Sequence, residues 1–591
     1  MEKLTDFKPI KKLVLPDLGE LSCSGLTVIV GPNSSGKSQL LKDINEKISG
    51  DPRELVVAKL LELAKIDHTA FIKCLKAEGY VSSFWDDNDQ EQYMPMTTAI
   101  GTGQGAKQVG TQQLAQWESL SLNASKRKRK DQYFGWFSRF FVTALFLENR
   151  LTSMTAANTI DFETQPPTHD LHALHLHDEA REALTIEIQR AFSKAIWSDI
   201  SKGNQICLRI AEGGQVPSAE ARLSVREMAK YRTLSSEGDG MKSYVATVIS
   251  ILLGRRPVSV IDEPEMCLHP PQAYNLGQFI GKNGTSKHTA TFVATHSSQI
   301  LRGVLQTAEE LQIVRLTRNQ SGFSGKLVDS AMLAESLKKP NVRAETVLDG
   351  IFAQAIAIIE ADGDRIVYQT TWEVVGQTRN FDIHFAAAGG TGGISDICDL
   401  YKMLGIPVAI IADLDLVTDL QKTKAVLESL CDDTELVESL RGEGRKIAEQ
   451  LRKLPPTMTE REVREKLSEL ASKDFDWSNG DDRGVRRELA RISNALNSMR
   501  GLKGGGLAYL PKEISKPLGE LLERFQKIGL FLVPVGELEY WLKDVGIAAS
   551  KKKKWAWANE AAEFIRSSQP QQGDIWQFMD GVGNYLTKQF N

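Results

Sequence analysis

Short apolar runs recur along this chain, and they lie far apart. The first spans residues 26–30 (Leu-Thr-Val-Ile-Val), and similar runs return at 258–261 and 291–294. Unbroken apolar runs of four or five residues predict strands buried on both faces, as in parallel sheets. We therefore predict an α/β domain over residues 1–345 that is assembled from distant segments. An insertion with helices and strands is expected between about residues 51 and 232.

A second series of apolar runs follows a linker-like segment at Lys338-Lys339-Pro340. These runs lie at residues 355–359, 408–411 and 529–535. Between about residues 418 and 500, Glu, Lys and Arg are dense and apolar residues recur at helical spacing, which predicts a helical insertion. The pattern indicates a second α/β domain over residues 346–591, with the boundary near residue 345.

Composition adds limits to this picture. With 591 residues, of which 41% are hydrophobic and 25% charged, the chain is globular and too long for one core. A formal net charge of −4 excludes a uniformly basic coat for nucleic acid but allows basic grooves. Six cysteines without paired spacing argue against disulfides and zinc. The chain shows neither a signal peptide nor a membrane-spanning run, so we expect a cytoplasmic protein.

A phosphate-binding loop follows the first apolar run. The stretch Gly31-Pro32-Asn33-Ser34-Ser35-Gly36-Lys37-Ser38 fits the pattern G-x-x-x-x-G-K-S, and a helix is expected from about Gln39. Backbone N–H groups of such a loop and the helix N-terminus hold nucleotide phosphates. We expect Lys37 to reach the β- and γ-phosphates and Ser38 to hold Mg²⁺, with Asn33, Gly36 and Gln39 as neighbouring nucleotide contacts.

Paired acids end the run at 258–261. Asp262 and Glu263 stand where an ATPase needs carboxylates for Mg²⁺ and for the attacking water. We predict that Asp262 supports the metal and Glu263 polarises the water. A strand end with a solvated turn is the structural alternative, which the phosphate-binding loop upstream disfavours.

Further motifs carry a family resemblance. Asp262-Glu263-Pro264-Glu265 with Leu268-His269-Pro270, and then Ala294-Thr295-His296-Ser297, resembles the Walker B, D-loop and H-switch of ABC-type ATPases in the SMC-like branch. The resemblance implies that His296 senses the γ-phosphate. A capped, buried histidine at a strand end is the alternative.

The segment Leu234–Gly240 resembles a degenerate form of the same family's signature motif, which covers the nucleotide of the opposite subunit. The resemblance implies that Ser236 and Gly238 contact nucleotide and that the heads associate as a homodimer or larger assembly. A glycine-rich start of a helix over about 241–253 is the alternative reading. Leu145–Arg150 is the nearest candidate for the glutamine loop, but it lacks the glutamine, so its role is unassigned.

A second set of acids follows the later runs. Glu360 and Asp364 come after the run at 355–359, and Asp413 and Asp415 after the run at 408–411. Parallel α/β sheets bind ligands at the carboxyl ends of their strands. An Asp-x-Asp pair directs both carboxylates to one side, and oxygen-only ligands favour Mg²⁺ or Mn²⁺ over zinc.

This pairing resembles the TOPRIM domain of topoisomerases, primases and OLD-family nucleases, with Ala361 in place of the usual glycine. The resemblance implies that Glu360, Asp364, Asp413 and Asp415 bind metal and that Glu360, Asp413 and Asp415 are catalytic. It also implies a further metal ligand after the run at 529–535, either Glu539, which we favour, or Glu537. Solvated strand-end turns are the structural alternative.

Four weaker features remain. Lys551–Lys554 could supply a charge-neutralising lysine, a phosphate-contact patch or a solvated loop. Lys126–Lys130 could meet nucleic-acid phosphates or form a surface loop, and the glycine-rich stretch 101–106 is expected to be a loop. The histidines between 169 and 177 fit a helix start better than a metal site.

The order of an ABC-type ATPase head and then a TOPRIM domain is that of OLD-family (overcoming lysogenization defect) proteins, which include anti-phage effectors of Gabija and some retrons. The resemblance implies an ATP-regulated, Mg²⁺-dependent DNA endonuclease or nickase, with a reverse transcriptase, noncoding RNA or helicase as a further partner. The alternatives are an ATP-dependent nucleic-acid sensor that does not cleave and a structural SMC-like protein. The chain lacks the long heptad arms of the latter.

Overall fold

The computed structural model divides the chain into two compact units, residues 1–335 and 336–591. It describes residues 6–591 apart from a set of gaps. The gaps are 52, 78–80, 86–90, 96–108, 111–137, 139, 153, 164–168, 254–255, 285–288, 340–341, 343, 378, 455–458, 473–481, 497–499, 544, 546, 548–553 and 571–573. Within the described part, no helix is both long and apolar enough to cross a membrane.

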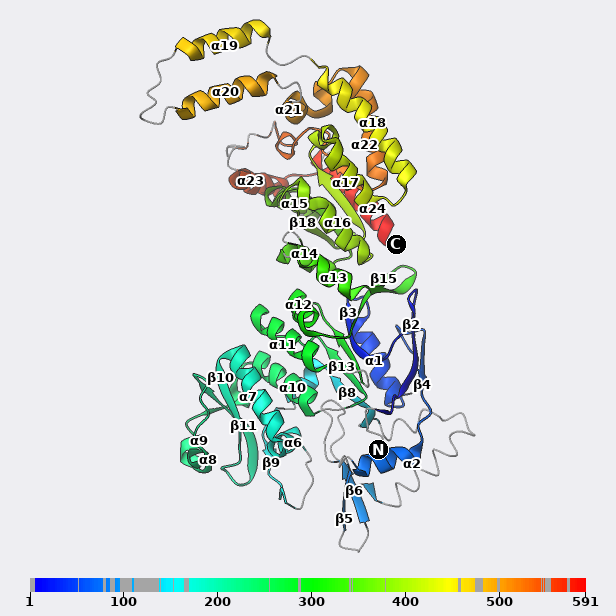
Figure 1. Cartoon of the computed structure of the whole chain (residues 1–591), viewed down its shortest axis with the longest axis vertical. Helices are drawn as coiled ribbons and strands as arrows, with labels where there is room; N and C mark the ends of the chain where they lie inside the picture. Colours follow the sequence, from blue (N-terminus) through cyan, green and yellow to red (C-terminus); the bar gives the residue numbers. More distant parts are fainter. Residues whose placement is uncertain are drawn as a thin grey trace. The chain divides into compact units, whose positions relative to one another are not determined.

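A six-stranded sheet forms the centre of the first unit, in the order β16-β15-β3-β14-β13-β8 (Figure 1). The bounds, in that order, are Gly322–Val328, Leu311–Asn319, Gly25–Val30, Ala290–Ala294, Val258–Asp262 and Val142–Leu145. Neighbouring strands are parallel except for the β15–β16 pair. The carboxyl ends of β3, β14, β13 and β8 therefore meet at one edge.

Helix α1 (Lys37–Ile48) is packed between this sheet and a smaller one (Figure 1). The smaller sheet has the order β2-β1-β4, with bounds Gly19–Leu21, Ile10–Leu15 and Leu60–Leu63. Leu40, Leu41, Ile44 and Ile48 recur at helical spacing and are fully buried. They join side chains of both sheets in one hydrophobic cluster, so this packing fixes where α1 begins and hence where the phosphate-binding loop lies.

The segment 51–232, predicted as an insertion, is not wholly one. It contains β8, which pairs with β13 and belongs to the central sheet. The rest of that span includes a side lobe with the strands β9 (Ala157–Asn158), β10 (Lys194–Asp199), β11 (Gln205–Glu212) and β12 (Arg232–Thr233). A further small sheet has the strands β5 (Val81–Trp85), β6 (Glu91–Pro95) and β7 (Val109–Gly110).

Helices complete the first unit. Besides α1, its described part contains α2 (His68–Ala77), α5 (Leu147–Thr152), α6 (Asp170–Leu176), α7 (Asp178–Phe192), α8 (Ala219–Leu223), α9 (Val225–Met228), α10 (Asp239–Leu253), α11 (Pro270–Asn283), α12 (Ser298–Thr307) and α13 (Ser330–Ser336), the last of which crosses the division between the units. Helix α10 follows the signature-like segment and is mostly buried, from Met241 to Ser250.

A four-stranded, fully parallel sheet forms the second unit, in the order β18-β17-β19-β20. The bounds are Ile383–Ala387, Ala355–Ile359, Val408–Ala412 and Leu530–Leu532. The flanking helices are α14 (Glu345–Asp349), α15 (Asp362–Val375), α16 (Ile394–Met403), α23 (Lys554–Ser567) and α24 (Ile575–Phe590). Both units therefore have the α/β architecture that the sequence predicts.

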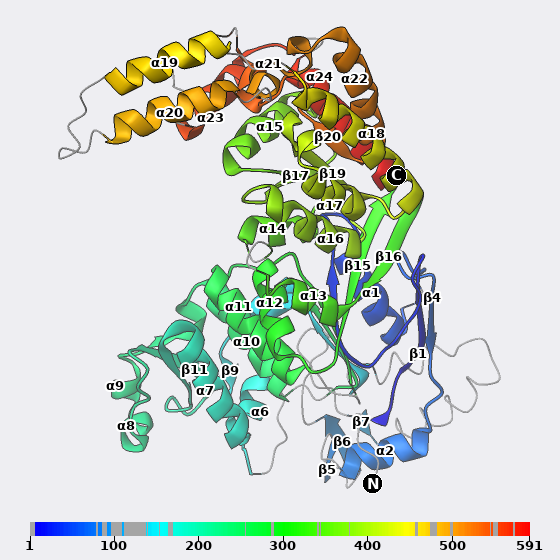
Figure 2. The ribbon, with the colours of Figure 1, turned by 45° about the horizontal axis from the view of Figure 1, so that its top comes forward.

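A long helical excursion separates β19 from β20. Its helices are α17 (Leu420–Leu430), α18 (Thr434–Arg452), α19 (Glu460–Ser472), α20 (Asp482–Leu496), α21 (Arg500–Tyr509) and α22 (Lys512–Lys527). Figures 1 and 2 show α19 and α20 as a pair that extends from the other helices of this unit. Although the excursion is long, β20 still pairs with β19 in register, with Ile410 opposite Leu530.

Candidate functional site

The phosphate-binding loop connects β3 to α1 through backbone conformations that favour glycine. Gly31 has φ 141° and Gly36 has φ 94°. A Cβ atom on Gly31 would lie 2.0 Å from the Leu316 carbonyl oxygen, and one on Gly36 would lie 2.7 Å from the Phe323 ring. The loop therefore requires glycine at both positions for two reasons, backbone conformation and close packing.

The predicted nucleotide contacts occupy different parts of this loop. Lys37 is buried, and its ammonium donates to the Gly31 and Pro32 carbonyls, at 2.8 Å each. Burial lowers the pKa of Lys37 to about 8, while Glu263, Asp262 and Glu265 oppose the shift. Asn33 is exposed at the loop tip. Gln39 donates to Asp43 (3.1 Å), an acid that also accepts backbone N–H groups of residues 56–58.

The two residues predicted to hold Mg²⁺ beside the nucleotide lie together. The Ser38 hydroxyl donates to Asp262 Oδ1 at 2.8 Å, joining positions that are 224 residues apart in sequence. Burial raises the pKa of Asp262, and the Ser38 hydrogen bond and the Arg150 and Lys42 charges oppose it. The parallel register of the strands produces this contact, since β3 and β13 end at the same edge.

Glu263 and His296 also lie together, with Oε1 and Nε2 3.4 Å apart. Burial and the nearby Lys37 charge lower the pKa of His296 to about 4, so this imidazole is neutral near pH 7. Burial, and then Asp262, raise the pKa of Glu263. A neutral imidazole beside a carboxylate suits contact with a water or a phosphate oxygen.

Glu265 has a structural role that the sequence did not indicate. It accepts the Thr295 hydroxyl at 2.8 Å and the His296 backbone N–H at 2.7 Å. It thereby fixes the end of β14, which carries His296. Glu265 stands two residues after Glu263, and the sequence indicated it only as part of the motif.

Arg150 is the second unassigned residue of this edge. The sequence pointed to its segment but gave it no role. Its side chain is fully buried and donates to the backbone carbonyls of Leu145, Asp262 and Glu263 and to the hydroxyl of Ser243.

The signature-like residues lie apart from these contacts. Ser236 and Gly238 are exposed just before α10, and a Cβ atom on Gly238 would meet nothing within 4 Å. In the described part of the chain, neither residue hydrogen-bonds to the phosphate-binding loop. Their placement leaves them open to another molecule.

In the second unit, acids from three strand ends share one neighbourhood. The Asp413 backbone N–H donates to Glu360 Oε1 at 3.4 Å, which joins the ends of β19 and β17. The Leu414 N–H donates to the Gly536 carbonyl at 3.0 Å, which joins the end of β19 to the segment after β20. Asp415 follows in a short 3₁₀ turn over Leu414–Thr418.

The charges at this edge reinforce one another. Burial raises the pKa of Asp413 to about 8, with further contributions from Glu360, Asp364, Asp415 and Glu537. Burial raises the pKa of Asp364 to about 6, with Glu539 and Glu360 adding to the shift and Lys554 opposing it. The charges of both acids considered after β20 act on this cluster, that of Glu537 on Asp413 and that of Glu539 on Asp364.

The donor chemistry fits a divalent cation, because hard carboxylate oxygens are its preferred ligands. Even so, among the residues that the structure describes, no three Asp, Glu, His or Cys side chains are close enough together to hold an ion. The carboxylates share a neighbourhood without forming a coordination shell. A bound cation would require side-chain rotation toward a common centre.

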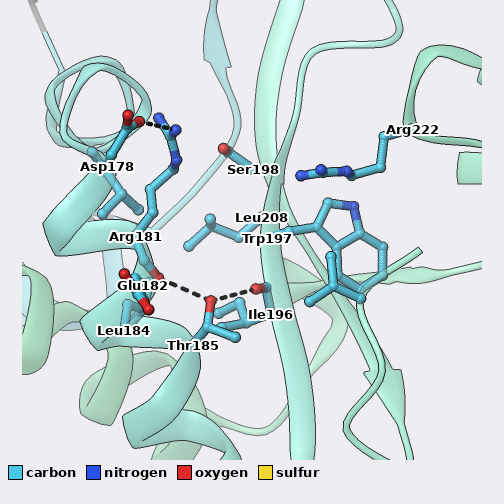
Figure 3. Close-up of a pocket in the computed structure, with 12 residues that line it drawn as sticks. Asp178, Arg181, Glu182, Leu184, Thr185, Ile196, Trp197, Ser198, Leu208 and Arg222 are labelled. Carbon is cyan, nitrogen blue, oxygen red and sulfur yellow. Dashed lines mark hydrogen bonds and ion pairs between the residues drawn. The ribbon is translucent and has the colours of Figure 1, made fainter. Parts of the chain in front are cut away.

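The side lobe contains a separate pocket of about 220 Å³ between α7, β10 and β11 (Figure 3). Arg181 pairs with Asp178 in its wall, and the Thr185 hydroxyl donates to the Arg181 and Ile196 carbonyls. None of the predicted nucleotide or metal residues lines it. In this lobe, His169 caps α6 by accepting the Leu171 N–H, and His172 Nε2 lies 2.7 Å from the Asn158 carbonyl oxygen.

Several predicted features fall outside the described residues. These are the glycine-rich loop at 101–106, the basic run at 126–130 and the lysines 551–553. Of the last group, Lys554 is described, at the start of α23, where its charge acts on Asp364.

Comparisons with known proteins agree with this division. A family described as "AAA domain, putative AbiEii toxin, Type IV TA system" matches residues 122–302. A family described as "Overcoming lysogenization defect protein-like, TOPRIM domain" matches residues 351–415, which contain Glu360, Asp364, Asp413 and Asp415. No curated protein matches the chain.

Solved structures with similarity include SMC heads. An SmcHead bound to the C-winged helix domain of ScpA has 9% identity, covers 55% of this chain and 99% of its own, and gives a TM-score of 0.32. The SMC head domain from Thermotoga maritima has 15% identity, covers 54% and 99%, and gives a TM-score of 0.26. An ATPase domain followed by an OLD-like TOPRIM domain matches the order of domains in an OLD-family ATPase/TOPRIM protein.

Proposed function

We propose that this protein is an ATP-regulated, divalent-metal-dependent endonuclease or nickase that acts on DNA, with a role as an anti-phage effector. The observation that carries the nuclease proposal is the position of Asp413, whose backbone N–H contacts Glu360 and whose pKa is raised by burial and then by the charges of four other carboxylates. Buried like charges are costly, and a fold retains them most readily where a cation binds.

In the ATPase half, the chain's own residues account for nucleotide binding and hydrolysis. The loop from Gly31 to Lys37 would hold the phosphates, and Ser38 and Asp262 would hold Mg²⁺. Glu263, with a pKa raised by burial, would accept a proton from the attacking water, and neutral His296 would contact the γ-phosphate.

In the TOPRIM half, Glu360, Asp413 and Asp415, joined by Asp364 and Glu539, would hold Mg²⁺ or Mn²⁺. When bound, such cations supply an activated water and stabilise the departing phosphodiester oxygen. Lys554, whose positive charge acts on Asp364, would contact a DNA phosphate at this edge.

The exposed Ser236 and Gly238 support association of two heads, because a signature segment that faces outward needs a partner's nucleotide. We therefore propose a homodimer or larger assembly. A reverse transcriptase, noncoding RNA or helicase as a further partner rests on the family resemblance alone.

Plasmid cleavage tests the proposal. Supercoiled DNA is incubated with the full-length protein, with Mg²⁺ or Mn²⁺, and with or without ATP; single-stranded RNA serves as a second substrate. We expect nicked or linear DNA from the wild type and at least 100-fold less from Asp413→Asn.

Matched variants separate the two halves. Asp432→Asn, at an exposed site, should cleave like the wild type. Lys37→Ala should lose ATP hydrolysis and alter the ATP dependence of cleavage without changing the metal requirement. Absence of metal-dependent cleavage under every nucleotide condition would reject the nuclease proposal.

A non-cleaving, ATP-dependent nucleic-acid sensor is the second candidate. It is favoured by the absence, among the described residues, of three acids close enough together to hold an ion. The sensor would bind DNA with or without Asp413, so gel-shift affinity that is unchanged in Asp413→Asn, together with no cleavage by the wild type, would support it.

A further inference from the structure

Arg150 occupies an unusual position at the carboxyl edge of the ATPase sheet. It lies in the short helix α5, after β8, and its side chain has 0% exposure. An arginine is rarely buried this completely, and it is retained only when hydrogen bonds replace its hydration. Here its acceptors come from three separate elements.

Two acceptors belong to the strand end that carries the hydrolytic acids. The guanidinium donates to the Asp262 carbonyl at 2.6 Å and to the Glu263 carbonyl at 2.8 Å. The third is the Leu145 carbonyl at the end of β8, at 3.0 Å. Arg150 therefore joins two neighbouring strand ends through their backbones.

The backbone of Glu263 needs this support. Glu263 has φ 45°, in the left-handed region that residues other than glycine rarely adopt. Its N–H donates to the Ala294 carbonyl at 2.8 Å, and its carbonyl accepts from Arg150 and from the Met266 N–H, the latter at 3.1 Å. These bonds hold the peptide on either side, and Arg150 supplies the only one of them that comes from a side chain, so it contributes to the direction in which the Glu263 carboxylate points.

The fourth acceptor lies on the signature helix. Arg150 Nε donates to the Ser243 hydroxyl at 3.0 Å, in the second turn of α10. Ser243 is fully buried, and α10 begins directly after Gly238. A second close contact joins α10 to the same region, since a Cβ atom on Gly240 would lie 2.2 Å from the Cys267 carbonyl oxygen.

We propose that Arg150 is a positioning residue that transmits the position of α10 to Glu263. A shift of α10, such as contact of the exposed Ser236–Gly238 segment with another molecule would produce, reaches the Glu263 backbone through Ser243 and Arg150. Hydrolysis in a head then depends, through Arg150, on what occupies that head's own signature face, while the affinity of the same head for nucleotide does not. The inference rests on the proposed ATPase function and adds a mechanism for its control.

The test uses two serine-to-alanine variants in the same helix of the full-length protein. Ser243→Ala removes the link to Arg150. Ser250→Ala is the matched control, because Ser250 is also buried but its hydroxyl has no hydrogen-bond partner among the residues that the structure describes. Melting temperature, the Kd for a fluorescent ATP analogue and kcat for ATP hydrolysis are measured for each, over a range of protein concentrations.

We expect Ser243→Ala to lower kcat about 5- to 20-fold with the Kd within about twofold of wild type. Any rise of kcat with protein concentration should be reduced as well. Ser250→Ala should match the wild type in all measurements. Arg150→Lys, which retains the charge and some of the hydrogen bonds, should keep more activity than Arg150→Met.

The outcomes separate the two proposals. A wild type that neither binds nor hydrolyses ATP rejects the proposed ATPase function. A wild type that hydrolyses ATP, with equal kcat in Ser243→Ala and Ser250→Ala, rejects the role of Arg150. A loss of ATP affinity as large as the loss of kcat in Ser243→Ala also rejects it, because that result indicates general disruption of the site.

Discussion

The chain places buried carboxylates at the ends of parallel strands twice, and the two places differ in their charge balance. Around Asp262 and Glu263, the positive charges of Lys37 and Arg150 oppose the effect of burial on the pKa values. Around Asp413, the four charges that shift the pKa most are all carboxylates. The first unit carries its counter-charges in its own sequence, whereas we propose that a cation from solution supplies most of them in the second unit.

Hydrogen bonding shows the same difference. Ser38 joins Asp262, and Thr295 and the His296 N–H join Glu265, so the acids of the ATPase edge are held in place before any ligand arrives. At the TOPRIM edge, the contact between the Asp413 N–H and Glu360 is long, at 3.4 Å. We infer that ligand binding reorganises the second site more than the first.

The largest expected effect tests whether the two edges act separately. Glu263→Gln should lower kcat for ATP hydrolysis about 100- to 1000-fold, because an amide cannot accept the proton of the attacking water. Binding of ATP should be retained, and metal-dependent cleavage without nucleotide should be unchanged. Malachite-green phosphate release and the plasmid assay measure the two activities, with the exposed Glu309→Gln as the control. An equal loss of both activities would show that the two edges do not act separately.

A smaller effect concerns stability and pH. The folded-state pKa of Asp413, about 8, is above the ordinary aspartate value, so this group favours folding at low pH. That contribution is complete below about pH 4 and is lost as pH rises through about 8. In EDTA, the second unit should therefore lose stability over this range, and Asp413→Asn should remove part of the loss, on the order of 1–3 kcal/mol at pH 8.

Urea unfolding from pH 5 to pH 8 measures this effect. Asp432→Asn, whose side chain is 91% exposed in the parent, is the control and should leave the pH dependence unchanged. As a contrast, Glu265→Ala should lower stability by about 1–3 kcal/mol, because it leaves the Thr295 hydroxyl and the His296 N–H without an acceptor. If Asp413→Asn and Glu265→Ala change the free energy of unfolding in the same direction at pH 8, the two edges do not differ in this respect.

The smallest effect concerns the cation that the chain does supply at the TOPRIM edge. Lys554 is the charge that opposes the raised pKa of Asp364. Lys554→Met should lower the cleavage rate about 10-fold, and Lys554→Arg should stay within about twofold of wild type. The exposed Lys588→Met is the control. Full activity of Lys554→Met would show that metal alone balances these acids.

Much of this arrangement is readable from the sequence, because the strands and loops that carry the acids have strong local signals. The runs before Gly31, Asp262, Glu360 and Asp413 form β3, β13, β17 and β19. Their parallel pairing then brings their ends to one edge in each unit. The individual roles of the site residues remain predictions.

Other features leave no local signal. The strand β8 lies in a longer apolar stretch beside helical residues, where periodicity does not separate a strand from a helix. Arg150 bonds mainly to backbone carbonyls of distant segments, which any sequence provides, so its contacts depend wholly on the tertiary fold.

The late position of β20 has a consequence for synthesis in the cell. The last strand of the ATPase sheet ends at Val328, but the strand that leads to Glu537 and Glu539 begins only at Leu530, after the helical excursion. Since domains fold as the ribosome releases them, the nucleotide-binding unit can be complete while the acidic edge still lacks its last members. Every nascent chain can thus complete its nucleotide-binding unit before the proposed nuclease site has all of its acids.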